Sequence, residues 1–194
     1  MRKAASLVKL LALAAGHHLH REQAMETLWP ELGRQAASNN LRQGLHAARR
    51  ALDPDSLVGP RYLASEDESI VLCPEGQLWV DSEAFEEAAR NAHHSREPAA
   101  YEFALNLYAG ELMPGDRYEE WAEEHRRRLR ETYLSLLLGL ARLHEDRADY
   151  NSAAEVLRRV VSEDPIREEA HIGLMRLYAL EGSKGEALGQ YGRL

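Results

Sequence analysis

The sequence is poor in cysteine, proline, glycine and long apolar runs, and each shortage excludes a class of protein. Cys73 is the only cysteine, so the chain cannot form an internal disulfide and is not a disulfide-stapled secreted scaffold. Its 7 prolines and 13 glycines among 194 residues are too few for a collagen-like or low-complexity chain. No apolar run approaches the roughly 20 residues that a membrane helix needs. We therefore expect a cytoplasmic, globular, helix-rich protein with no membrane contact.

Sequence motifs of catalytic and cofactor sites are also missing. There is no phosphate-binding glycine loop, no CxxC pair and no nucleophile elbow. His17, His18 and His20 lie close together, but no cysteine is near them, and solvated turn histidines explain them better than a zinc site. The pair His93 and His94 is expected in a polar loop. We therefore expect no catalytic residue, no metal and no cofactor, and the protein is not expected to be an enzyme.

Charge is unevenly distributed along the chain. The formal net charge is −8, yet residues 1–61 contain 9 Lys or Arg against 5 Asp or Glu, whereas residues 62–194 contain 15 against 27. A basic first third joined to an acidic remainder is typical of a protein in which the basic part meets phosphates. The acidic total therefore does not exclude nucleic acid as a partner.

Residues 1–77 have the pattern of three helices followed by a β-hairpin. Gly16 is expected to end the first helix, and Pro30 the second. The hairpin carries an acidic tip, Glu66-Asp67-Glu68. This order fits a winged helix-turn-helix, and it equally fits a generic three-helix bundle with an attached hairpin. The expected elements are Lys3–Ala15, about Arg21–Leu28, about Arg34–Leu52, Tyr62–Ala64 and Ser69–Leu72.

The third expected helix has two distinct faces. Arginine can pair with guanine, and asparagine or glutamine with adenine, so its polar face favours DNA recognition over an ordinary solvated surface. The expected apolar stripe is Ala37, Leu41, Leu45 (or Gly44), Ala48 and Leu52. The opposite face carries Asn39, Arg42, Gln43, His46, Arg49 and Arg50.

From Asp81 onward the sequence predicts helices only, and it contains an internal repeat. Gly139-Leu140-Ala141-Arg142-Leu143 recurs as Gly173-Leu174-Met175-Arg176-Leu177, and Ala153 recurs as Ala187 at the same offset. The offset matches the period of tetratricopeptide repeats, about 34 residues, which have small residues where paired helices touch. The expected helices are Ser82–Ala92, Pro98–Tyr108, about Tyr118–Asp146, Ser152–Ser162, Ile166–Leu180 and Gly185 onward.

Several longer motifs resemble a known family of bacterial activators. "LHREQAMETLWPE" and "ASNNLRQGLHAARRALDPD" resemble the OmpR-type winged helix of antibiotic-regulatory (SARP) activators. "LWVDSEAFE", "LYAGELMPG" and "DPIREEAHIGLMRLYALEG" resemble the bacterial transcriptional activator domain that follows it in such proteins, a set of tetratricopeptide-like helices. The resemblance covers nearly the whole chain.

The resemblance implies a DNA-binding activator of transcription. Its partners would be double-stranded promoter DNA and RNA polymerase, with a homodimer and further domains of a longer native chain as other contacts. The recognition helix would be Ala37–Leu52, and Trp29 would pack the turn before it. The DNA-facing candidates are Asn39, Asn40, Arg42, Gln43, His46, Arg49 and Arg50.

Three departures from the family pattern stand out. The chain begins almost inside the first helix, so we expect the small sheet that usually precedes that helix to be missing. The acidic hairpin tip does not suit a phosphate contact. The last repeat stops in mid-helix at Leu194, so we expect a truncated C-terminal end.

We therefore expect a mainly α protein with two domains. Residues 1–77 would form a winged helix-turn-helix with a small β-hairpin, and residues 78–194 an α-helical tetratricopeptide-like domain. Trp79, Val80 and Phe85 would form a buried interface between them, because the connecting segment is too short for a free tether. The alternative is a repeat-type adaptor for protein interactions whose winged helix no longer binds DNA.

Overall fold

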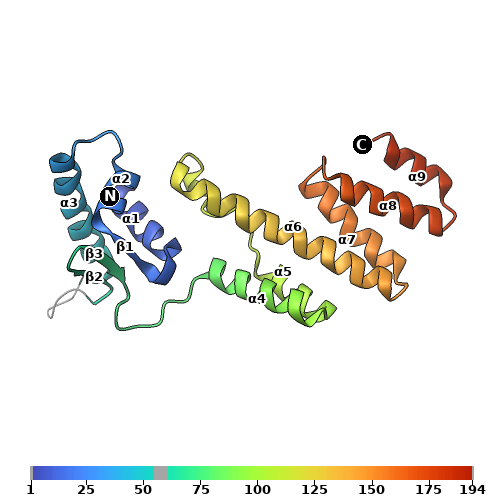
Figure 1. Cartoon of the computed structure of the whole chain (residues 1–194), viewed down its shortest axis with the longest axis horizontal. Coiled ribbons are helices and arrows are strands. Elements are labelled where there is room, and N and C mark those ends of the chain that lie inside the picture. The colour runs from blue at the N-terminus through green and yellow to red at the C-terminus, as the bar shows by residue number, and fades with distance from the viewer. Residues whose placement is uncertain (1, 55–60, 194) are drawn as a thin grey trace. The chain divides into compact units, whose positions relative to one another are not determined.

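The computed structural model describes residues 2–54 and 61–193, and the chain divides into two compact units. The first unit comprises the residues up to Val80 together with Arg117–His125. The helical unit comprises Asp81–Asp116 and the residues from Arg126 onward. The predicted mainly α class, a winged helix followed by helical repeats, is confirmed (Figure 1).

The first unit has the element order of a winged helix. A short strand lies between the first two helices, and the last two strands form a hairpin after the third helix. Its main elements are α1 (Arg2–Leu13), β1 (His18–His20), α2 (Arg21–Leu28), α3 (Arg34–Leu52), β2 (Leu63–Glu66) and β3 (Ser69–Leu72). A 3₁₀ turn, η1 (Ala15–His17), precedes β1, and another, η3 (Glu120–Ala122), lies in the later segment of this unit.

β1 was not expected from the sequence. The three strands form one antiparallel sheet in the order β1-β3-β2, in which His18 pairs with Val71 and Leu63 with Leu72. The prediction that His18 and His20 are turn residues is therefore wrong, because both lie in a strand. The hairpin is thus part of a three-stranded sheet and not a separate attachment to a helical bundle.

The helix boundaries of the first unit have local causes. Gly16 adopts φ 64°, a left-handed conformation that costs glycine little, and the chain turns there into β1. The His20 side chain accepts a hydrogen bond from the Glu22 backbone N–H at 3.2 Å. The Gln23 side chain accepts one from the His20 N–H at 3.2 Å in return, so α2 begins in a reciprocal capping box.

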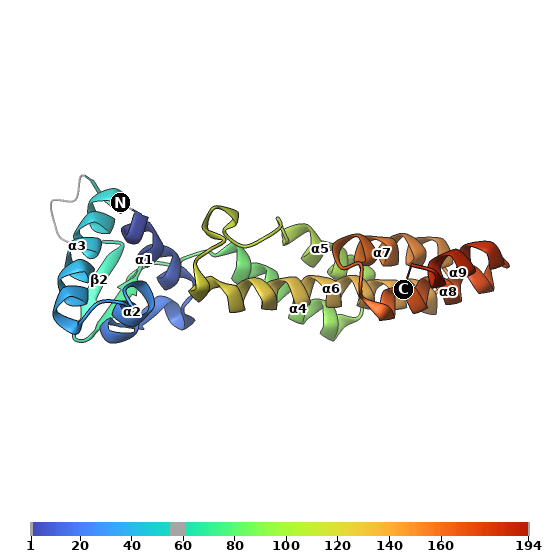
Figure 2. The ribbon, with the colours of Figure 1, turned by 90° about the horizontal axis from the view of Figure 1, so that it is seen from above.

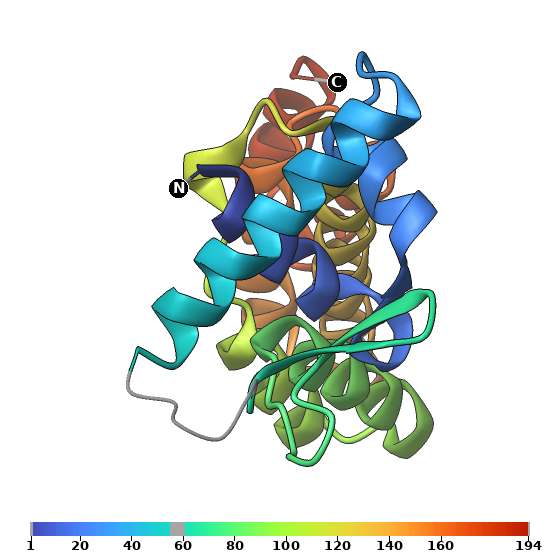
Figure 3. The ribbon, with the colours of Figure 1, turned by 90° about the vertical axis from the view of Figure 1, so that its left-hand side faces the viewer.

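The core of the first unit lies between α1, α2, α3 and the sheet. Leu7, Leu11 and Leu41 are fully buried there, and α3 lies directly over α1 (Figure 3). The predicted stripe of α3 is buried as far as Ala48, but Leu52 is 37% exposed, so its assignment to the stripe is wrong. It occupies the last position of α3.

The helical unit is a succession of antiparallel neighbours (Figure 2). Its core contains Phe85, Tyr101, Leu137 and Leu174, all buried. The expected long helix from Tyr118 begins only at Glu123, because η3 and irregular chain precede it. The elements of the helical unit are α4 (Asp81–Ser95), α5 (Pro98–Leu107), η2 (Pro114–Asp116), α6 (Glu123–Asp146), α7 (Tyr150–Glu163), α8 (Glu168–Leu180) and α9 (Lys184–Tyr191).

The repeated glycines mark close helix contacts. A Cβ atom on Gly139 of α6 would lie 2.6 Å from Cε1 of Tyr101 on α5. A Cβ atom on Gly173 of α8 would lie 2.7 Å from Cδ1 of Leu157 on α7. Each glycine therefore lets its helix approach the preceding helix closely, at equivalent positions of the repeat. This confirms the close approach that the repeat predicts.

The expectation of a polar loop at His93 and His94 is wrong. Both lie in the last turn of α4. The His93 ring meets the Tyr101 ring edge-on, and its Nδ1 lies 3.2 Å from the Tyr101 hydroxyl. His93 is therefore part of the packing between α4 and α5.

Candidate nucleic-acid interface

α3 presents a continuous exposed face along its length. Asn39, Arg42, Gln43, His46 and Arg50 are all exposed, and they are spaced so that they share one side of the helix. We call these five residues the reading face. Gln35 is exposed on the same side, four residues before Asn39, and the sequence interpretation missed it although the spacing would have found it.

Among the described residues, the reading face has no partner. None of its five side chains hydrogen-bonds or pairs with another side chain or carbonyl within residues 2–54 and 61–193. α3 contains four arginines and no acidic residue, so no neighbouring carboxylate on the helix neutralises the face. Its guanidinium, amide and imidazole donors are therefore available to an external ligand.

Several arginines of the helical unit are paired. Arg128 pairs with Glu86 at 2.8 Å and Arg147 with Glu97 at 3.2 Å. Arg142 and Arg176, at equivalent positions of the repeat, pair with Glu169 and Glu145. The side chains of Arg90 and Arg96 of the same unit are exposed and have no hydrogen bond or ion pair among the described residues, so both kinds of surface arginine occur in this unit.

Two of the predicted candidates differ from the other five. Asn40 is half-buried on the flank of α3. Arg49 is half-buried as well, and its Nε donates to the Leu63 carbonyl at 2.8 Å while Nη2 donates to the Ser65 hydroxyl at 3.0 Å. Replacement of Arg49 should therefore lower stability, because two hydrogen bonds to β2 would be lost.

The hairpin is short and held at its acidic turn. Its strands pair from Leu63–Leu72 to Glu66–Ser69, and Asp67 adopts φ 49° between them. The Arg21 backbone N–H at the start of α2 donates to the Glu68 carbonyl at 2.8 Å. β1 pairs along β3 as far as Ser69, so the hairpin does not extend past the sheet.

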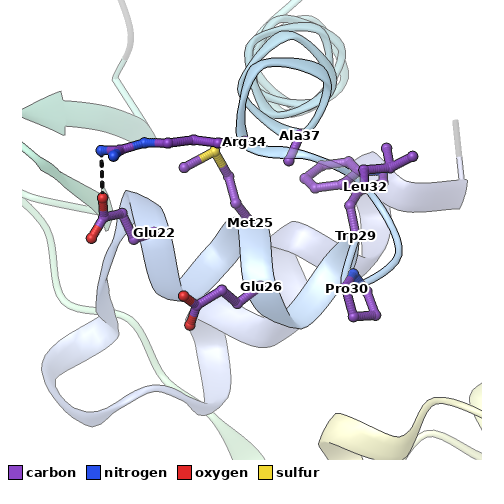
Figure 4. Close-up of a pocket in the computed structure, with 8 residues that line it drawn as sticks. All are labelled: Glu22, Met25, Glu26, Trp29, Pro30, Leu32, Arg34 and Ala37. Atoms are coloured by element: carbon purple, nitrogen blue, oxygen red, sulfur yellow. Dashed lines mark hydrogen bonds and ion pairs between the residues drawn. The ribbon is translucent and has the colours of Figure 1, made fainter.

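A hollow of about 480 Å³ lies between α2 and the start of α3 (Figure 4). The Glu22–Arg34 ion pair, 2.6 Å long, lies at one end, and Trp29, Pro30 and Leu32 lie at the other. The Trp29 ring packs toward α3, 3.6 Å from where a Cβ on Gly44 would be. The remaining residues that line the hollow are Met25, Glu26 and Ala37. No reading-face residue lines the hollow.

The expected burial of Trp79 is wrong. Its side chain is 72% exposed, since it lies in the irregular segment between β3 and α4 and has no helix or strand to hold it. Phe85 is 2% exposed but belongs to the core of the helical unit itself. Trp79→Ala should therefore cost much less than the ~3–5 kcal/mol of a large core truncation.

The described residues contain no metal site and no membrane span. No three His, Cys, Asp or Glu side chains in residues 2–54 and 61–193 come together as metal ligands. Within the same residues, no helix combines the length and the apolar character required to cross a bilayer.

Comparison with known proteins gives a family match and a structural match. Residues 80–194 match the family model described as "Bacterial transcriptional activator domain". The fold is similar to that of Mycobacterium tuberculosis EmbR, solved in complex with a low-affinity phosphopeptide, with a TM-score of 0.76 and 18% sequence identity. That match covers 100% of this chain and 52% of the EmbR chain, so this chain spans about half of its length. No curated protein matches the sequence.

Proposed function

Since the chain belongs to the bacterial transcriptional activator domain family, we propose that it binds promoter DNA through its first unit and uses its helical unit for protein contacts. In this proposal the two units are a DNA-binding domain and an activator domain. RNA polymerase, a second copy of the chain or a sensor module would bind the helical unit.

The unpaired reading face of α3 is the observation that carries the DNA proposal. A helix in the major groove reads bases through side chains that are free to form bidentate hydrogen bonds. Arg42 and Arg50 supply donors for guanine, and Asn39 and Gln43 supply the donor and acceptor pair that adenine requires.

The test is selection of duplexes from a random pool, followed by binding titrations on the selected sequence. We expect Arg42→Ala and Arg50→Ala each to cost ~1–3 kcal/mol of specific binding. Arg142→Ala is the matched control, because it removes the same charge from an exposed and paired position in the helical unit. Wild-type affinity in the Arg42→Ala/Arg50→Ala double variant would refute the reading-face assignment.

The acidic, tied hairpin favours one alternative function. Glu66, Asp67 and Glu68 would repel phosphates, and the turn is already bonded to Arg21. An adaptor whose winged helix does not bind DNA would explain both features. In that case the wild-type protein would enrich no sequence from the pool and would bind DNA no better than Arg42→Ala does.

A further inference from the structure

The edge of the small sheet leaves one carbonyl in need of a partner. β2 is an edge strand, since the order is β1-β3-β2. The Cys73 N–H donates to the Tyr62 carbonyl at 2.8 Å, and this fixes the alternation of the antiparallel ladder. The next residue of β2, Leu63, consequently directs its carbonyl away from β3. An outward carbonyl on a sheet edge requires a donor from elsewhere.

Arg49 supplies that donor from α3. Its Nε bonds to the Leu63 carbonyl at 2.8 Å, and its Nη2 bonds to the Ser65 hydroxyl at 3.0 Å. Two donors of one planar guanidinium thus engage the same strand, two residues apart. This rigid double contact fixes a distance and an orientation between the last turns of α3 and the hairpin. Both of these donor groups are then oriented toward β2.

The hairpin is anchored at its other end too. The Glu68 carbonyl accepts from Arg21 at the start of α2, so the turn is bonded to one helix and the edge strand to another. The acidic residues of the turn begin at Glu66, directly after Ser65. Arg49 therefore holds the part of β2 that directly precedes the acidic residues of the turn.

We propose that Arg49 is a positioning residue that locks the hairpin to the recognition helix and reads no base pair itself. This inference rests on the proposed DNA-binding function. The lock sets where the last two turns of α3, with His46 and Arg50, lie relative to the acidic turn. Removing it weakens binding to every operator alike, whereas removing a base reader erases the preference at one base pair.

The experiment measures three variants, Arg49→Lys, Arg49→Ala and Ser65→Ala, on a panel of duplexes with single base-pair changes in the selected operator. We expect each to lower affinity about threefold to tenfold for all duplexes, with the order of preferred base pairs unchanged. Arg49→Ala/Ser65→Ala should bind no more weakly than Arg49→Ala. Arg42→Ala should instead flatten the preference at one position.

The opposite pattern overturns the proposal. If Arg49→Ala erases one base preference while Ser65→Ala has no effect, Arg49 is a base reader. If Arg49→Lys retains full affinity, only its charge matters and the lock does not exist.

A second measurement without DNA separates this inference from the proposed function. Hydrogen exchange of the amides from Leu63 to Leu72 should accelerate in Arg49→Ala and Ser65→Ala, even if the wild-type protein binds no DNA. Unchanged protection in both variants refutes the lock whatever the DNA assays give.

Discussion

At the scale of single residues, some arginines of this chain are paired and others are exposed without a partner among the described residues. Arg142 and Arg176 form ion pairs within the helical unit. Arg42 and Arg50 lie exposed on α3, a helix that contains no carboxylate. Exposed ion pairs contribute little to stability, ~0–1 kcal/mol each. The distribution of arginine therefore has more bearing on ligand binding than on folding.

Gly173 provides the first prediction. A Cβ at this position would lie 2.7 Å from Cδ1 of Leu157, so Gly173→Leu should overpack the contact between α8 and α7 and destabilise the fold by ~1–3 kcal/mol. Gly189 on α9 is the matched control, because a Cβ there has no atom within 4 Å. Gly189→Ala should stabilise by up to ~1 kcal/mol. Chemical denaturation would check both, and an unchanged midpoint in Gly173→Leu would contradict the packing argument.

Asp149 provides a prediction about pH. Its carboxylate accepts from the Ser152 N–H at 3.2 Å as the N-cap of α7. Hydrogen bonds from Ser152, with a smaller effect of the nearby His144, hold the pKa of the Asp149 carboxyl below its ordinary value. Because folding favours the ionised form, this stabilisation is complete above the unfolded pKa and is lost as the pH falls through the folded pKa.

We therefore expect Asp149→Ala to lower the melting temperature at neutral pH and to differ less from the wild type as the pH falls below about 4. Glu155→Gln, an exposed carboxylate on the same helix, is the control and should leave the curve nearly unchanged. A difference between Asp149→Ala and the wild type that stays constant across that range would show that the charge of the cap does not matter.

At the scale of elements, a buried polar link joins α8 and α9. His171 is 1% exposed and Gln190 is 4% exposed, and the Gln190 amide nitrogen lies 2.7 Å from His171 Nδ1. With Nδ1 accepting, Nε2 carries the proton and donates to the Pro165 carbonyl at 2.9 Å. One neutral imidazole thus connects α9, α8 and the segment before α8.

Gln190→Leu should therefore destabilise by ~1–3 kcal/mol, because it leaves a buried nitrogen of His171 without its donor. Leu188→Ala, at a 72% exposed position on the same helix, is the control and should have a small effect. Urea denaturation measures both variants. If Gln190→Leu is as stable as the wild type, the link contributes nothing to the packing of α9.

The elements also show what the sequence could predict. α2 and α3 lie where apolar periodicity and Pro30 place them, since these signals are local. β1 was not predicted from the sequence because its three residues, His-Leu-His, include no β-branched residue. Its partner strand β3 also lies far along the chain, after α3. The exposed face of α3 followed from helical spacing. The engagement of Arg49 did not, because it depends on where the Leu63 carbonyl points after the sheet has formed.

At the scale of the whole molecule, the segregated charge predicts a strong salt dependence. The chain carries −8 overall, yet positions 1–61 hold 9 Lys or Arg against 5 Asp or Glu. DNA affinity should therefore rise as salt is lowered, despite the acidic total.

Each arginine that contacts a phosphate should contribute about one unit to the slope of log affinity against log salt concentration. Arg50→Ala should reduce the slope by about that amount if it contacts the backbone, and leave it unchanged if it contacts a base. Anisotropy titrations at several salt concentrations measure this. An affinity independent of salt would contradict a phosphate-based contact.

The short, tied hairpin has a consequence for how this protein would find its targets in a genome. With its turn bonded to Arg21, the described part of the hairpin does not extend past the sheet, and in the proposed complex α3 would supply the sequence information. One helix can distinguish about five base pairs, a motif that recurs roughly once per thousand base pairs. Against about 10⁶–10⁹ competing sites, a single copy would be diluted over many equivalent positions. Selective occupancy of a promoter would then depend on several copies bound side by side, so the number and spacing of motifs would define the target.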